Sequence, residues 1–141
     1  MKRKISIIIS VVFAFVFIFN IMAFAALPET DSIMNNNTLE TSTGFTISNN
    51  GTAYVSVSYT GYSNITTGAE ISVVIKKNTF LWFTSTVVDE TYNIVGENYS
   101  HTYYYDLTSS GSGTYKCYVT YTISGSGGAD DVIPYEGQAS Y

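Results

Sequence analysis

Residues that could act in catalysis are few in this chain of 141 residues. It has one cysteine, Cys117, and one histidine, His101, and nucleophilic catalysis needs a base oriented beside its nucleophile. Strand alternation places Cys117 in the core, and it places His101 on a face with Tyr103 and Tyr105, as a half-buried histidine bonded to a neighbour. No phosphate-binding glycine loop, zinc motif or serine-elbow motif is present. We therefore expect neither an enzyme nor a bound cofactor.

Adjacent acidic residues are a second candidate for chemistry. Asp89 and Glu90 form one pair, and Asp130 and Asp131 form another. Carboxylates in turns can bind calcium, and two acids that flank a cleft can hydrolyse a glycoside. No EF-hand or nonapeptide spacing supports a calcium site. We interpret both pairs, and also Glu136, as solvated turn acids, so they are weak calcium candidates only.

Aromatic residues are the most suggestive feature, with 13 Tyr, 8 Phe and one Trp. Strand alternation places Tyr54, Tyr104 and Tyr118 on faces otherwise made of Ser, Thr, Asp and Lys. Exposed tyrosines build recognition surfaces, although tyrosine beside threonine also stabilises the wet face of a sheet through cross-strand pairs. These three residues and Trp82 are the candidates for ligand binding.

Segments with period-two alternation must position these side chains. Period two with many Val, Ile, Thr and Tyr is typical of strands. Strands are expected at 52–60, 70–77, 79–88, 98–107 and 114–123, and turns at 48–51, 60–69, 76–78, 109–113 and 124–131. No helical period follows residue 43, so we predict an all-β, antiparallel sandwich of about seven strands. The predicted inward side chains are Ala53, Val55, Val57, Tyr59, Ile71, Val73, Ile75, Tyr99, Tyr103, Tyr105, Leu107, Tyr115, Cys117, Val119, Tyr121 and Ile123.

The N-terminus has the pattern of a secretory signal peptide. A basic cluster at 2–4 precedes an apolar run at 5–19, and Ala23-Phe24-Ala25 provides a small-x-small site. Cleavage between Ala25 and Ala26 is the preferred interpretation. The run is also long enough to be retained as a membrane anchor, which is the alternative.

Residues 26–43 read as a flexible polar leader, and 44–141 as the β-sandwich domain. Removing residues 1–25 leaves three lysines and all eleven acids, a net charge of 3 − 11 = −8. Such an acidic chain favours neither nucleic acid nor an anionic membrane as a partner. A single cysteine excludes an intrachain disulfide.

The stretch "GTYKCYV" at 113–119 resembles the sixth strand of an immunoglobulin-type domain. There, a tyrosine two residues before a cysteine forms the tyrosine corner, with its hydroxyl bonded to backbone upstream. The resemblance assigns this role to Tyr115 and leaves Cys117 as a small buried hydrophobe. It also implies that Trp82 is a core tryptophan, in which case Leu81 and Phe83 form a contact patch.

Over residues 45–135 the chain also resembles small secreted β-sandwich proteins of clostridia and related Gram-positive bacteria, in strands such as "AYVSVSYTG" and "ISVVIKK". This resemblance implies a fold and an extracellular or envelope address, and no activity. We expect a non-catalytic binding module for an extracellular glycan or protein. The alternatives are an assembly subunit that pairs through strand edges and a small bacteriocin-like effector.

Overall fold

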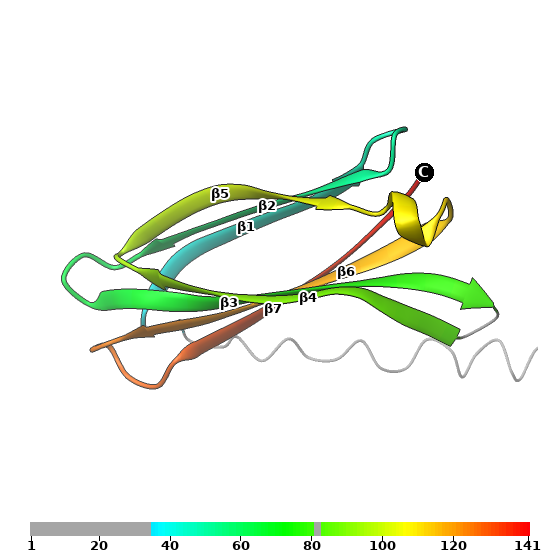
Figure 1. Cartoon of the computed structure of the whole chain (residues 1–141). Coiled ribbons are helices and arrows are strands. Elements are labelled where there is room, and N and C mark those ends of the chain that lie inside the picture. Colours follow the sequence, from blue (N-terminus) through cyan, green and yellow to red (C-terminus); the bar gives the residue numbers. More distant parts are fainter. Residues whose placement is uncertain (1–34, 81–82) are drawn as a thin grey trace, which may run out of the picture. The chain divides into compact units, whose positions relative to one another are not determined.

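The computed structural model describes residues 35–80 and 83–141, which fold into a β-sandwich of seven antiparallel strands (Figure 1). The strands and one short 3-10 helix are β1 (Thr38–Ile47), β2 (Thr52–Gly61), β3 (Thr66–Phe80), β4 (Phe83–Val95), β5 (Asn98–Asp106), η2 (Thr108–Ser110), β6 (Thr114–Gly125) and β7 (Asp131–Ser140). The signal peptide, its cleavage site and residues 26–34 of the leader lie outside the described residues, as do Leu81 and Trp82. Within the described part of the chain, none of the helical segments has the length and apolar character that a membrane crossing requires.

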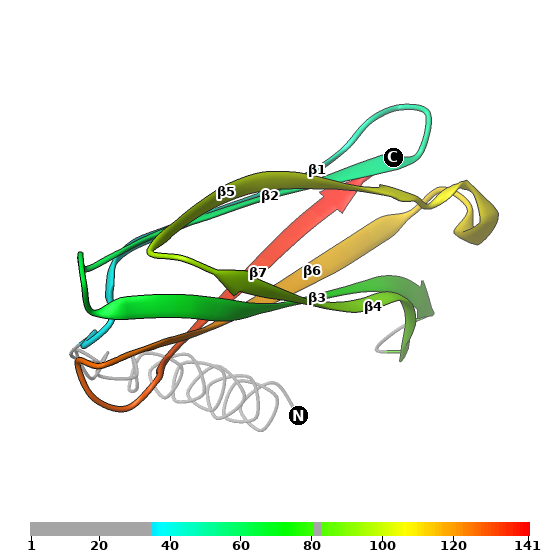
Figure 2. The ribbon, with the colours of Figure 1, turned by 60° about the vertical axis from the view of Figure 1, so that its left-hand side comes forward.

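Two sheets form the layers of the sandwich (Figures 1 and 2). One has the order β1-β2-β5, and the other has the order β4-β3-β6-β7. The inward residues of β2, β3 and β6 make the core, as period-two alternation predicts. Those buried side chains are Ala53, Val55, Val57, Tyr59, Ile71, Val73, Ile75, Tyr115, Cys117, Val119, Tyr121 and Ile123. The all-β fold, the strand number and the core of these three strands are therefore confirmed.

The sixth strand carries the tyrosine corner that the immunoglobulin resemblance implies. The hydroxyl of Tyr115 donates a hydrogen bond to the carbonyl of Gly111, upstream of β6. Cys117 is fully buried, and burial raises the pKa of its thiol to about 12, as expected for a packing residue. One strand departs from the constant-type arrangement, because β4 pairs with β3 and not with the sheet of β1, β2 and β5.

The first strand starts at Thr38, inside the segment expected to be a flexible leader up to residue 43. Before Phe45 its inward positions are threonines, so this half of the strand lacks the apolar alternation that predicts a strand. The Tyr121 hydroxyl replaces apolar packing there: it lies 2.6 Å from the Thr43 hydroxyl and donates to the Ser42 carbonyl at 3.1 Å. Hydrogen bonds to the opposite sheet therefore hold a strand that has few apolar residues.

The predicted turn at 76–78 and the predicted strand at 79–88 are both wrong. Strand β3 continues through 76–78 to Phe80, and β4 returns from Phe83 in register with it, with Phe80 opposite Phe83. The segment 79–88 is thus the end of a hairpin and not one strand. Polar residues are tolerated at 76–79 because the side chains there are half-buried or exposed.

Candidate functional site

Two of the predicted tyrosines meet on the outer face of the β1-β2-β5 sheet. Tyr54 in β2 and Tyr104 in β5 are directly paired across the strands. Their ring centroids lie 5.3 Å apart, with the ring planes at 75°, which is the edge-to-face geometry that aromatic quadrupoles favour. Tyr104 is 66% exposed. The pair is therefore an aromatic platform that is open to solvent.

Hydroxyl side chains surround this platform. Ser56 and Thr102 are the next outward pair along the strands, and their hydroxyl oxygens lie 3.3 Å apart. Ser58 and Ser100 form the pair after that. The lysines of the described residues all belong to the other sheet. The outer face of β2 and β5, which we call the hydroxyl face, thus offers aromatic rings and hydrogen-bonding groups without a positive charge.

Tyr118, the third predicted tyrosine, lies on the outer face of the other sheet. The ammonium of Lys76 sits 5.5 Å from the centre of its ring, in cation–π geometry. The neighbouring Lys116 forms an ion pair of 2.6 Å with Glu136. Tyr118 therefore shares no surface with Tyr54 and Tyr104, and Trp82 lies outside the described residues.

Of the four acids predicted to be solvated turn carboxylates, only Asp130 is one. Asp89 and Glu90 are exposed residues within β4, and Glu90 accepts a hydrogen bond from the Tyr92 hydroxyl. Asp130 is exposed in a loop, whereas Asp131 is only 2% exposed. Among the described residues no group of three or more His, Cys, Asp or Glu side chains is close enough together to hold a metal ion.

Asp131 has a structural role that the sequence did not indicate. Its two carboxylate oxygens accept hydrogen bonds from the backbone N–H groups of Asn36 and Asn37, at 2.9 and 2.8 Å. Asn37 is itself buried, and its side-chain amide donates to the carbonyl of Ala129 at 2.9 Å. The hydroxyl of Thr66 donates to the Asn37 carbonyl. This polar cluster ties the start of β1 to β3 and to the loop between β6 and β7.

The candidate nucleophile and base are kept apart. Cys117 is buried in β6, while His101 lies in β5, in the other sheet. His101 is exposed, not half-buried as predicted, because β5 is an edge strand that leaves this position uncovered. Its ring packs edge-on against Tyr103, with 4.7 Å between centroids. Tyr103 in turn stacks on Tyr92 at 3.8 Å.

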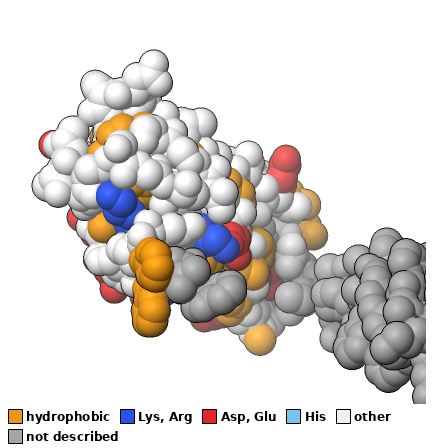
Figure 3. All heavy atoms as spheres, turned by 90° about the vertical axis from the view of Figure 1, so that its right-hand side faces the viewer, with side chains coloured by type: hydrophobic (Ala, Val, Ile, Leu, Met, Phe, Trp, Pro, Cys, Tyr) orange, Lys and Arg blue, Asp and Glu red, His pale blue; other side chains and the backbone are white. Residues whose placement is uncertain are grey.

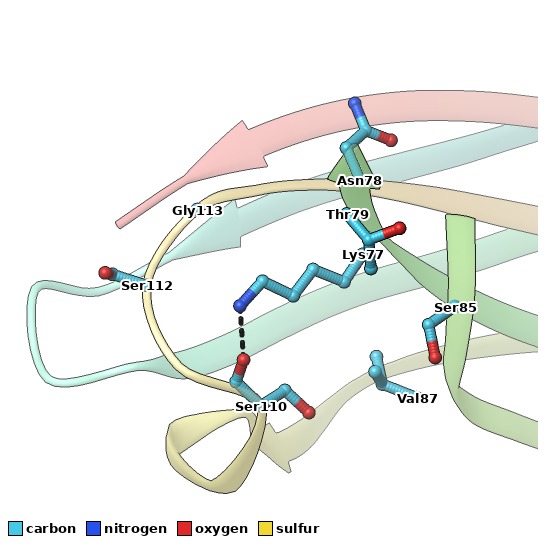
Figure 4. A pocket seen from close by; sticks show the side chains of 8 residues that line it. All are labelled: Lys77, Asn78, Thr79, Ser85, Val87, Ser110, Ser112 and Gly113. Atoms are coloured by element: carbon cyan, nitrogen blue, oxygen red, sulfur yellow. Dashed lines mark hydrogen bonds between the residues drawn. The ribbon is translucent and has the colours of Figure 1, made fainter. Parts of the chain in front are cut away.

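A polar concavity of about 560 Å³ lies beside the β3–β4 hairpin, and sequence reasoning missed it (Figure 4). Lys77 reaches across it and donates to the carbonyls of Ser110 and Gly111, the latter at 3.1 Å. The hairpin forms one wall, and the loop from η2 to β6 forms the other. The lining residues are Lys77, Asn78, Thr79, Ser85, Val87, Ser110, Ser112 and Gly113. The serine- and glycine-rich run at 109–113 is the only local signal of it.

Comparisons with known proteins give a likeness in fold. No protein-family model matches the chain, and no curated protein matches it in sequence. Among solved structures, a β-glucosidase from Listeria innocua in complex with isofagomine is similar over 73% of this chain, with 14% identity and a TM-score of 0.42. The same enzyme in complex with glucose is similar over 71%, with 16% identity and a TM-score of 0.40. This chain spans 16% of the length of each of them. Its own strand order shows a small all-β, two-sheet domain.

Proposed function

We propose that this protein is a non-catalytic, secreted binding module that holds an extracellular glycan on its hydroxyl face. The observation that carries the proposal is the contact of the exposed Tyr104 with the half-buried Tyr54 on a face lined by serine and threonine. The separation of Cys117 from His101 supports the non-catalytic part.

The chemistry of this face fits a neutral sugar. The C–H bonds of a pyranose ring carry a small positive charge, and the face of a tyrosine ring carries a negative one, so the two stack. Hydroxyls at Ser56 and Thr102 can both donate to and accept from the hydroxyls of a sugar. The alternation of a strand repeats these groups along the sheet, which suits an extended polysaccharide.

The test is retention of the purified chain from Ala26 onward on washed cell walls and on a panel of insoluble polysaccharides. We expect saturable binding to one of them, and about tenfold weaker binding for Tyr104→Ala, as for other aromatic hot spots. Tyr54→Ala is expected to weaken binding in the same direction. Tyr104→Phe keeps the ring and is expected to keep most of the affinity.

Tyr118→Ala is the matched control, because it removes the same kind of side chain from the other sheet. Equal losses from Tyr118→Ala and Tyr104→Ala would contradict a site on the hydroxyl face. A folded chain that binds none of the surfaces would refute the glycan proposal.

A second candidate, an assembly subunit, is favoured by the edge of the larger sheet. Strand β4 is a 13-residue edge strand without proline, whereas β7 at the opposite edge contains Pro134, which lacks a backbone N–H. This candidate predicts multimers that grow with protein concentration in sedimentation velocity. The glycan-binding module predicts a monomer.

A further inference from the structure

The hairpin of β3 and β4 carries an exposed apolar pair that the core does not use. Phe80 and Phe83 face one another across the ladder and are 71% and 69% exposed. Neither belongs to the hydrophobic core or packs against it. Figure 3 looks onto this end of the sandwich and shows hydrophobic side chains projecting from the surface. Two adjacent, solvated phenylalanines are unfavourable unless a partner covers them.

Every lysine of the described residues lies close to the same hairpin. Lys76 and Lys77 precede Phe80 in β3, and Lys116 is directly paired with Lys76 on the neighbouring strand β6. In Figure 3 lysine side chains appear near the projecting hydrophobic ones. Lys77 is bonded to carbonyls, so its charge is held in place without being neutralised.

Carboxylates at this end are already engaged. Glu136 is the ion-pair partner of Lys116, and Asp106 accepts hydrogen bonds from the backbone and hydroxyl of Thr108. Among the described residues, Lys116–Glu136 is the only ion pair, which leaves the charges of Lys76 and Lys77 uncompensated by an ion-pair partner.

Five of the nine acids of the described residues lie at the opposite end, with Glu40 near the start of β1 among them, whereas Asp89 and Glu90 lie midway along β4. Glu70 is near the start of β3, Glu97 is in the β4–β5 turn, and Asp130 and Asp131 are in the β6–β7 connection. From Glu70 to Phe80 the strand extends roughly 33 Å, more than three times the Debye length of about 10 Å at 0.1 M salt. A surface that meets the hairpin end-on is therefore nearer to the lysines than to the acids of the opposite end, which are screened. Asp89 and Glu90, opposite Val74 and Val73, are closer to Lys76 and weaken the positive potential there.

We propose that Phe80 and Phe83 dock into the interface of an anionic lipid bilayer, with Lys76 and Lys77 over the headgroups. Apolar rings bury at the boundary between headgroups and acyl chains, and nearby lysines add attraction to anionic lipids. Two such signals together are what stable peripheral binding requires. The site is separate from the hydroxyl face. The expectation that no anionic membrane is a partner came from net charge alone, which takes no account of where charges lie.

Flotation with lipid vesicles tests this, using the chain from Ala26 onward, because the apolar run at 5–19 would itself bind lipid. Residues from Met34 to Tyr141 form a compact unit that contains the whole described core, so this chain retains the fold. We expect it to float with vesicles of phosphatidylcholine containing phosphatidylglycerol as the minor component, and much less with phosphatidylcholine alone. Raising the salt concentration is expected to reduce the binding.

The decisive variant is Phe80→Ser/Phe83→Ser, for which we expect at least about tenfold weaker flotation. Lys76→Gln is expected to weaken it about fivefold. The matched control is Val95→Ser/Val132→Ser, which removes exposed apolar side chains from the opposite end and is expected to leave flotation unchanged. All variants are checked for an unchanged circular dichroism spectrum and melting temperature.

Three outcomes would overturn the proposal. These are no flotation of the unmodified chain, equal flotation of the phenylalanine variant, or a dimer in sedimentation that the phenylalanine variant abolishes without any lipid binding. The last would assign the pair to a second copy of the chain. Polysaccharide retention of the same variants is expected to be unchanged, while Tyr104→Ala keeps flotation, so the two proposals fail independently.

Discussion

The end of the sandwich where β1 begins is built differently from the end where β3 meets β4. At the first, Asn37, Thr66 and Asp131 are buried polar residues that hydrogen-bond across three elements. At the second, Phe80 and Phe83 are apolar residues in solvent. The usual distribution is thus reversed, with polar groups inside at one end and apolar groups outside at the other.

Both ends share one device, a buried tyrosine whose hydroxyl donates to a loop carbonyl. Tyr59 bonds Gly96 at 2.8 Å at the first end, and Tyr115 bonds Gly111 at the second. The tyrosines therefore secure the connections at both ends, and only the first end adds a buried carboxylate. The comparison indicates that the buried polar cluster at the first end stabilises the fold, while the second end leaves Phe80 and Phe83 exposed for contact with a partner.

Alkaline pH is expected to lower the free energy of unfolding more than any substitution below, because buried tyrosines at both ends of the sandwich ionise. Burial raises the pKa of six tyrosines above the usual value of 10, and it raises the pKa of Tyr115 to about 12. The six are Tyr59, Tyr92, Tyr103, Tyr105, Tyr115 and Tyr121. Between pH 10 and 12 the folded state binds more protons than the unfolded state. Their contribution to the free energy of unfolding is therefore complete below pH 10 and is lost as the pH rises through 12.

Tyrosinate absorbance and circular dichroism, recorded together against pH, provide the measurement. Part of the tyrosine signal is expected to appear only as the fold is lost. Full ionisation near pH 10 with an intact fold would show that neither end protects its tyrosine.

Asp131→Ala is expected to cost about 3 kcal/mol of the free energy of unfolding, because two buried backbone N–H groups lose a charged acceptor. Asp130→Ala changes the adjacent, exposed carboxylate and is expected to stay within about 0.5 kcal/mol. Urea unfolding of both variants gives the difference. Similar losses for the two would remove the distinction between the ends of the molecule.

Tyr115→Phe is expected to have the smallest effect of the three, about 1 kcal/mol. It removes one hydrogen bond to Gly111, whose carbonyl keeps a second donor in Lys77. Tyr118→Phe, on the solvent side of the same strand, serves as the control and is expected to change stability by less than about 0.5 kcal/mol. A loss well above 1 kcal/mol would mean that the second end is secured as firmly as the first.

The sequence was informative for β2, β3 and β6, whose inward faces form most of the core. In β2 and β6 the inward residues are apolar or aromatic, so alternation alone identified them and assigned Tyr54 and Tyr104 to an outer face. Their contact could not be predicted, because it depends on the register between β2 and β5, which are far apart in sequence. The polar start of β1 was missed because it lacks apolar alternation, and the partner of its Thr43, the Tyr121 hydroxyl, lies in the opposite sheet.

Local sequence was misleading where long-range contacts decide the outcome. Asp131 follows a glycine-rich run and resembles a solvated acid, and nothing near it shows that the N–H groups of Asn36 and Asn37 reach it. The lysines and asparagine at 76–78 resemble a turn because they are polar, yet they continue a hairpin. The concavity beside that hairpin could not be predicted from the sequence, because the hairpin that forms one of its walls was not expected.

The pairing of Tyr54 with Tyr104 has a consequence for the order of folding. The whole β3–β4 hairpin lies between these residues in sequence, so the β2–β5 ladder closes a long loop, whereas β3 and β4 close a very short one. Because loop closure costs more entropy as the loop lengthens, we expect the hairpin to form first. Phe80 and Phe83 are then already paired while the rest of the chain is still unfolded. The tyrosine platform appears only when the long-range β2–β5 ladder closes, so glycan retention would also report that this ladder has formed.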